Sequence, residues 1–252
     1  MLRRSVRIHK SMEQKIKIKT NDKKVIYGTL TPSTKKSDKL IIFVHGMTSS
    51  SYEPKYYNAV RFFRDHGFNS LVFEQYSGGN KGARRFIDTM TSTHVHDLNV
   101  VVHHFNNKYK KLYLVTHSWG GPVAMLADLT PIAALVLWDP SINYTLKENK
   151  YFAYDKRVDA YVTDWGVQTL VGKAWVEEAR ALPAPEDLGA RLTKPTKIIA
   201  AKIGNSHKTK HLFKKVKVPT AYHHIDYASH NFPEWGAQEE LFRETLTWLK
   251  RW

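Results

Sequence analysis

The stretch KLYLVTHSWGG, residues 111–121, contains the pattern that decides the fold. Its apolar first half predicts a buried strand, and the segment after its glycines has helical character. A sharp turn from strand to helix exposes a serine hydroxyl on a strained backbone, and small neighbours let that turn close. Gly120 meets this requirement, whereas Thr116, two residues before Ser118, stands where such turns usually have glycine. We expect Ser118 to be a nucleophile at this elbow; a helix N-cap serine is the alternative interpretation.

Strands and helices alternate on both sides of this stretch. The expected strands are residues 14–20, 25–32, 39–44, 68–74, 112–116, 133–138, 198–201 and 220–225. The expected helices are residues 56–66, 93–109, 122–129 and 239–252. The first two strands are joined by a polar turn and predict a hairpin. Because parallel neighbours need long crossovers, the remaining alternation predicts an α/β fold with a mostly parallel sheet flanked by helices.

Residues 141–190 interrupt this alternation and are rich in aromatic side chains. No clear buried strand is evident there. Ligands of open α/β folds bind at the carboxyl edge of the sheet. We therefore expect a single domain, residues 1–252, with residues 141–190 forming a cap insertion over that edge.

Two other segments supply groups that suit a serine nucleophile. His45-Gly46-Met47 ends a buried strand, where a loop can bring the Met47 amide towards Ser118. The Trp119 amide, at a helix start, is the second donor for a developing oxyanion. The loop that follows the last strand carries His230, which can reach back over the sheet edge towards the serine.

These motifs together resemble the α/β-hydrolase superfamily over residues 14–252, and within it the serine esterase and monoacylglycerol-lipase-like branch. The resemblance implies an eight-stranded sheet with a cap and a Ser-His-acid triad. It implies that Ser118 is the nucleophile, His230 the general base and acid, and Met47 and Trp119 the oxyanion-hole residues. A serine at the elbow argues against the branches that use a carboxylate nucleophile.

The acid of the triad is the weakest part of the pattern. The family usually places it after the penultimate strand, but residues 194–217 contain no Asp or Glu, and Asn205 stands in roughly that place. Asp139, at the end of the strand AALVLW, is the acid we expect, although Asp before Pro is also a common turn residue. Asp226, four residues before His230, is a further alternative.

These residues predict a serine hydrolase that cleaves a carboxylic ester through an acyl-enzyme. The aromatic insertion suggests a small-molecule substrate with an apolar or aromatic part, although a cap also needs aromatic residues for its own core. Thioester, amide or carbon–carbon bond hydrolysis by the same triad is the nearest alternative. A non-catalytic protein that binds nucleic acid or an anionic surface is the alternative from another class.

The net charge of the chain is +16, from 39 Lys and Arg against 23 Asp and Glu. Residues 1–24 contribute +7 and residues 194–217 contribute +8, so the rest of the chain is close to neutral. We expect these basic segments to be solvated or to lie on an anionic surface. No nucleic-acid recognition motif is present, so we do not expect a nucleic-acid partner.

The absence of cysteine excludes disulfides, thiol catalysis and cysteine-ligated metals. His94 and His96 lie two residues apart on the expected helix and therefore face different sides, which argues against a shared metal. We expect no metal and no cofactor. No apolar run is long enough to span a membrane. The basic start lacks the apolar stretch of a secretory signal, and we expect a cytoplasmic protein.

Overall fold

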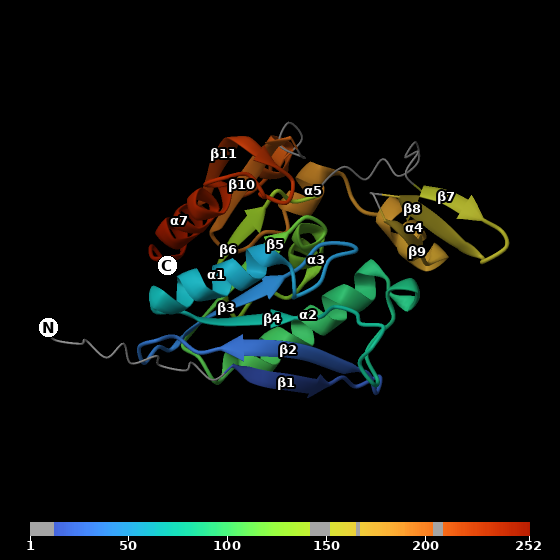
Figure 1. Cartoon of the computed structure of the whole chain (residues 1–252). Coiled ribbons are helices and arrows are strands. Elements are labelled where there is room, and N and C mark those ends of the chain that lie inside the picture. The colour runs from blue at the N-terminus through green and yellow to red at the C-terminus, as the bar shows by residue number, and fades with distance from the viewer. Residues whose placement is uncertain (1–12, 142–151, 165–166, 204–208) are drawn as a thin grey trace, which may run out of the picture.

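An eight-stranded sheet forms the centre of the computed structural model, which describes residues 13–141, 152–164, 167–203 and 209–252 (Figure 1). The strand order is β1-β2-β4-β3-β5-β6-β10-β11. The strands are β1 (Gln14–Lys19), β2 (Val25–Thr31), β3 (Lys39–Val44), β4 (Asn69–Phe73), β5 (Lys111–His117), β6 (Ile132–Trp138), β10 (Thr196–Ile203) and β11 (Thr220–Ser229). β2 is antiparallel to both β1 and β4, and all other neighbours are parallel. The predicted hairpin and the mostly parallel sheet are therefore confirmed.

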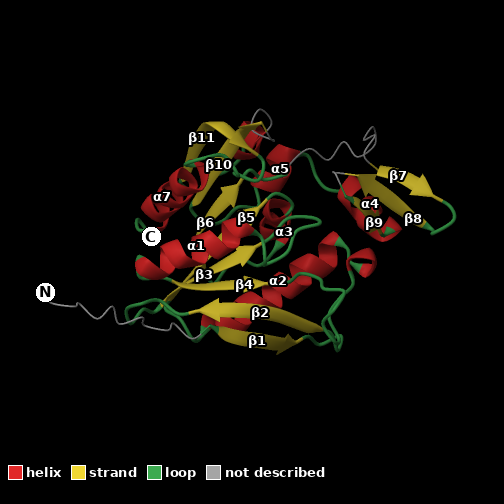
Figure 2. Ribbon diagram, in the orientation of Figure 1, coloured by secondary structure: helices red, strands yellow, loops and turns green. Residues whose placement is uncertain are grey.

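Helices cover both faces of this sheet (Figure 2). The helices are α1 (Pro54–Asp65), α2 (Thr91–Asn106), α3 (Gly120–Leu126), α4 (Lys173–Arg180), α5 (Pro185–Gly189) and α7 (Ala237–Leu249). Successive side chains of a strand point to opposite faces, so β3 places Ile42 in the core under α2 and α3, and Phe43 in the core under α1 and α7. None of the helices described here is long and apolar enough to cross a membrane.

The expected insertion contains a second, three-stranded antiparallel sheet. Its strands are β7 (Phe152–Asp155), β8 (Ala160–Asp164) and β9 (Gln168–Val171). These strands were missed in the sequence because they are four or five residues long and partly exposed, which leaves no run of apolar residues. In Figure 1 this sheet and α4 lie to one side of the main sheet, beyond α3.

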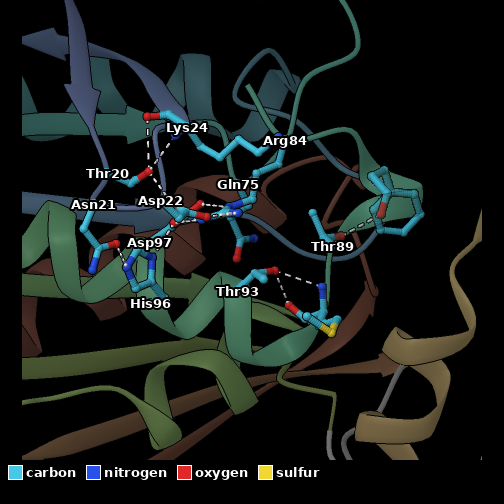
Figure 3. Close-up of polar contacts among 12 residues, drawn as sticks. Thr20, Asn21, Asp22, Lys24, Gln75, Arg84, Thr89, Thr93, His96 and Asp97 are labelled. Carbon is cyan, nitrogen blue, oxygen red and sulfur yellow. Dashed lines mark hydrogen bonds and ion pairs between the residues drawn. The ribbon is translucent and has the colours of Figure 1, made fainter. Parts of the chain in front are cut away.

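A buried ion pair joins the hairpin turn to α2 and to the segment that follows β4 (Figure 3). Arg84 donates two hydrogen bonds to the Asp97 carboxylate, at 2.7 and 2.8 Å, and two more to Asp22, at 2.8 and 3.2 Å. His96 extends the network, because its two ring nitrogens contact Asp97 and Asn21 at 2.9 and 2.8 Å. These contacts join the second turn of α2 to the β1–β2 hairpin turn and to the segment after β4.

Candidate active site

The turn at the end of β5 is the sharp elbow predicted from the sequence. Ser118 has a φ of 54°, in the left-handed region that is strained for a residue with a side chain. Its N–H donates to the carbonyl of Trp138 at 3.1 Å, and its carbonyl accepts the N–H of Gly121 at 3.0 Å. A Cβ atom at Gly120 would lie 2.7 Å from the carbonyl oxygen of Val44, so only glycine fits this close approach.

Thr116 does not loosen the elbow, although it departs from the usual glycine. It is fully buried within β5 and is paired in register with Val44 of β3 and Leu137 of β6. The β-branched side chain therefore sits on a pleated strand, where such residues pack well. The turn begins only after it.

Asp139 and His230 are directly hydrogen-bonded. The Nδ1 atom of His230 lies 2.5 Å from Oδ2 of Asp139, which is fully buried. The other carboxylate oxygen, Oδ1, accepts the backbone N–H of Ala201 at 3.1 Å. Asp139 leaves β6 with a φ of 37°, so the end of this strand bends to direct the carboxylate at the histidine. Both oxygens of this acid thus have an assigned donor.

Three separate elements hold the loop that carries His230. Its N–H donates to the carbonyl of Ile203 at the end of β10, at 3.1 Å. Its carbonyl accepts a hydrogen bond from Nε2 of His117, at 2.8 Å. The next residue, Asn231, accepts a hydrogen bond from the buried ammonium of Lys55 through Oδ1, at 3.0 Å. The histidine loop is therefore fixed from β10, β5 and α1.

His117, the residue before Ser118, is a neutral histidine in contact with His230. Their ring centroids are 4.7 Å apart, and burial holds the pKa of His117 well below its usual range. Because Nε2 faces a carbonyl, Nε2 carries the single ring proton. Because His117 is neutral, it does not repel a positive charge on the neighbouring His230 ring. No local sequence signal indicates this contact, which joins the end of β5 to the loop after β11.

The loop after β3 lies against Ser118. A Cβ atom at Gly46 would come within 2.8 Å of Cβ of Ser118. The Gly46 carbonyl accepts two hydrogen bonds, from Nδ1 of the buried His45 at 2.9 Å and from the Tyr76 hydroxyl at 3.2 Å. His45 can donate because its Nε2 accepts the backbone N–H of Gln75 at 3.1 Å, and burial lowers its pKa.

These two hydrogen bonds also orient the amide of Met47. In a trans peptide the C=O and the following N–H point in opposite directions, so fixing the Gly46 carbonyl fixes the Met47 N–H. This N–H has no hydrogen-bond acceptor among the described residues. His45, Tyr76 and Gln75 thus fix the direction of the Met47 N–H, one residue beyond the glycine that lies against Ser118. No local sequence signal indicates this role.

Ser141 is the hydrogen-bond partner of Ser118. The two Oγ atoms are 3.0 Å apart, and the backbone N–H of Ser141 donates to the Ser118 carbonyl at 3.0 Å. No hydrogen bond joins Ser118 Oγ to the His230 ring in the described part of the chain. Ser141 was missed in the sequence, although its place two residues after Asp139 puts it at the same strand end.

Trp119 connects the elbow to the insertion. Its indole ring lies 4.7 Å from that of Trp175 on α4, and Trp175 stacks on Phe152 of β7 at 6.0 Å. All three side chains are buried. The residue whose amide is the second expected oxyanion donor therefore packs its side chain against aromatic residues of the insertion.

The remaining sequence candidates lie elsewhere. Asn205 falls outside the described residues. Asp226 is 79% exposed and pairs with His224 at 2.7 Å, so its carboxylate is engaged away from His230. His94 is buried, whereas His96 bonds to Asp97 and Asn21 as described above, and the described residues contain no group of three or more side chains suited to a metal.

A family model of the alpha/beta hydrolase family matches residues 41–244. The chain therefore belongs to this family, in agreement with the resemblance inferred from its motifs. No curated protein matches the sequence.

Solved structures with the same fold include known esterases. Est1E from Butyrivibrio proteoclasticus, solved with ferulic acid bound, is 19% identical with a TM-score of 0.78 and aligns over 93% of this chain and 99% of its own. The alpha/beta hydrolase GrgF from Penicillium sp. sh18 is 16% identical, with a TM-score of 0.76 over 95% and 98% of the two chains. An esterase of Pyrococcus furiosus is 21% identical, with a TM-score of 0.70 over 96% and 93%. At these identities the similarity establishes the fold.

Proposed function

We propose that this protein is a serine hydrolase that cleaves carboxylic esters through Ser118, His230 and Asp139. Ser118 Oγ attacks the ester carbonyl carbon while its proton passes to Nε2 of His230. The carbonyl electron pair moves to the oxygen and returns as the alcohol leaves, taking the proton from His230. Water then attacks the acyl-enzyme by the same steps, which releases the carboxylic acid and restores the Ser118 hydroxyl.

The observation that carries the proposal is the Asp139–His230 hydrogen bond beside the elbow serine. A buried carboxylate on Nδ1 holds the imidazole with Nε2 free to accept a proton, and it stabilises the imidazolium that follows. In this structure Ser118 Oγ is hydrogen-bonded to Ser141 Oγ, and the Ser118 proton turns to Nε2 of His230 when substrate binds. Catalytic hydrogen bonds are often longer before substrate binds.

The backbone supports an oxyanion hole formed by the amides of Met47 and Trp119. The Met47 N–H is directed by the hydrogen bonds on the Gly46 carbonyl, and Gly46 itself contacts Ser118. Trp119 is the N-cap residue of α3, where the positive end of the helix dipole favours negative charge. Two fixed donors at one oxygen are the usual means of stabilising such a transition state.

The aromatic side chains next to Trp119 support a substrate with an apolar or aromatic part. Trp175 and Phe152 of the insertion form one aromatic cluster with Trp119, and we propose that residues 141–190 cap the site. The ferulic acid bound to Est1E is an aromatic acid, which agrees with this class of substrate. A thioester, amide or carbon–carbon bond substrate would use the same groups and is tested by changing the substrate.

The basic segments provide less support for a separate binding function. In residues 194–217, Lys197 is buried against the Glu244 carboxylate, Lys215 pairs with Asp187 and Lys194 donates to the carbonyl of Thr130. These lysines have structural partners. Docking of the remaining basic residues on an anionic surface stays a prediction.

The experiment is covalent labelling with a fluorophosphonate probe together with hydrolysis of short p-nitrophenyl esters. Wild-type protein is expected to be labelled on Ser118 and to release p-nitrophenol, and Ser118→Ala should lose both activities. Ser37→Ala is the matched control: it removes a serine that donates one hydrogen bond, to the Gly67 carbonyl at 2.6 Å, at the opposite edge of the sheet. Folded wild-type protein that is neither labelled nor active would refute the proposal.

A further inference from the structure

Ser141 contacts Ser118 through both its side chain and its backbone. The hydroxyl contact is 3.0 Å and the N–H to carbonyl contact is also 3.0 Å. Gly121 donates to the same carbonyl, so the Ser118 backbone is held from two sides. The Ser118 side chain can still rotate about its Cα–Cβ bond, and the hydrogen bond with the Ser141 hydroxyl acts on this rotation.

A short segment connects this contact to the acid. Asp139 binds His230 through its carboxylate, and Ser141 binds Ser118 two residues later. Pro140, between them, fixes its own φ and packs on the elbow, because a Cβ atom at Gly121 would lie 2.7 Å from Cβ of Pro140. Residues 139–141 thus contact both the histidine and the serine, with a proline of fixed φ between the two contacts.

The proton count of the two hydroxyls indicates which one donates. Ser118 has one proton, and in the proposed mechanism this proton goes to Nε2 of His230. Its oxygen has two lone pairs, so it can accept a hydrogen bond while it donates. Ser141 fits the role of donor to Ser118, because an Oγ that accepts from Ser141 keeps its own proton available for the imidazole.

We propose that Ser141 is a positioning residue that donates a hydrogen bond to Ser118 Oγ and holds this hydroxyl in the rotamer that can reach His230. The inference rests on the proposed function. Serine hydroxyls have three staggered rotamers, and a hydrogen bond of ordinary strength is sufficient to favour one of them. Without it, Ser118 is in the reactive orientation for a smaller fraction of the time.

Ser141→Ala tests this role, since it removes the hydroxyl and keeps the backbone N–H. The rate constant for fluorophosphonate labelling and kcat for p-nitrophenyl acetate are expected to fall about fivefold, the factor that corresponds to one hydrogen bond of ordinary strength. KM should stay within about twofold because the ester-binding surface is unchanged. Ser141→Thr keeps a hydroxyl and should recover most of the rate, and Ser37→Ala should behave as wild type.

The possible results separate the inference from the proposed function. A wild-type protein that is not labelled would overturn both. If the wild type is labelled and Ser141→Ala reacts at the same rate, only the role of Ser141 is overturned. A faster Ser141→Ala would also overturn it, because Ser141 would then hold Ser118 away from His230. A loss that appears in KM and in thermal stability, and that Ser141→Thr does not restore, would indicate a structural role instead.

Discussion

Asp139→Asn is the substitution whose effect the structure predicts in most detail. The two carboxylate oxygens have different donors: Oδ1 accepts the Ala201 N–H at 3.1 Å and Oδ2 accepts Nδ1–H of His230 at 2.5 Å. The Ala201 N–H belongs to β10 and cannot turn. An asparagine has only one acceptor oxygen, so it cannot satisfy both donors.

The two orientations of the asparagine amide differ in cost. If its NH₂ group faces Ala201, two donors meet in a fully buried place, which costs about 1–3 kcal/mol. If its NH₂ group faces His230, the imidazole must present an unprotonated Nδ1, so its proton moves to Nε2 and it can no longer accept the Ser118 proton. The second orientation is favoured, and it leaves a histidine of the wrong tautomer.

The expected loss in kcat follows from these terms. A preference of about 1–3 kcal/mol for the inactive tautomer lowers the rate about 5- to 150-fold. The imidazolium also loses the negative charge at Oδ2, and together the two effects predict a decrease of about 10³- to 10⁴-fold. KM should change little, because the acid does not contact the substrate.

The assay is p-nitrophenyl ester hydrolysis by folded protein, with thermal unfolding as a check on stability. Asp226→Asn is the control, because this exposed carboxylate is engaged with His224 and should be dispensable. An Asp139→Asn protein that is as stable as wild type and retains kcat within about tenfold would show that Asp139 is not the acid of the triad.

Three further predictions concern stability and the elbow. Burial lowers the pKa of His94 to about 3. As the pH falls below 6.5, the unfolded chain therefore takes up a proton on this histidine before the folded chain does. The free energy of unfolding is thus unaffected by His94 above pH 6.5 and decreases as the pH falls from 6.5 towards 3. Between pH 7.5 and 5.0, the free energy of unfolding of His94→Leu should therefore decrease by about 2 kcal/mol less than that of the wild type, as measured by urea unfolding. Equal decreases in the two proteins would contradict this. Hydrogen bonds from the Thr20 hydroxyl and the Arg84 guanidinium lower the pKa of Asp22 to about 2. The contribution of the Asp22 carboxylate to the free energy of unfolding is therefore complete above pH 3.8 and is lost as the pH falls to 2. Asp22→Asn should reduce the pH dependence of stability between pH 3.8 and 2. Gly120→Ala would place a methyl group 2.7 Å from a carbonyl oxygen of β3, and it should slow fluorophosphonate labelling about 10²-fold. Gly78→Ala is the control and should be neutral, because its Cβ would meet nothing within 4 Å. Equal labelling rates of the two variants would argue against a tight elbow.

The parts of the site that could be predicted from the sequence are those with a local signal. A buried strand followed by Ser118 and Gly120 is visible in eleven consecutive residues, and His230 follows the last strand. The acid was predicted by elimination, since the usual segment contains no carboxylate. In the structure the Asp139 carboxylate is hydrogen-bonded to His230, and its role as the acid of the triad stays a prediction.

The contacts that could not be predicted depend on the alignment of distant segments. Ser141 meets Ser118 only because β5 and β6 are in register at their carboxyl ends, where His117 pairs with Trp138. His117 and Lys55 reach the His230 loop from elements far apart in the chain. The strands of the insertion escaped detection because each is short and partly exposed, so hydrophobic periodicity is absent.

The contact between the Trp119 and Trp175 rings makes the position of the insertion measurable by optical spectroscopy. Two indoles 4.7 Å apart couple electronically, and one is the neighbour of the nucleophile while the other belongs to α4. Any movement of α4 away from the elbow separates the two chromophores and exposes both to water. Near-ultraviolet circular dichroism and tryptophan emission would therefore report opening of the insertion in the unmodified protein, without an added label.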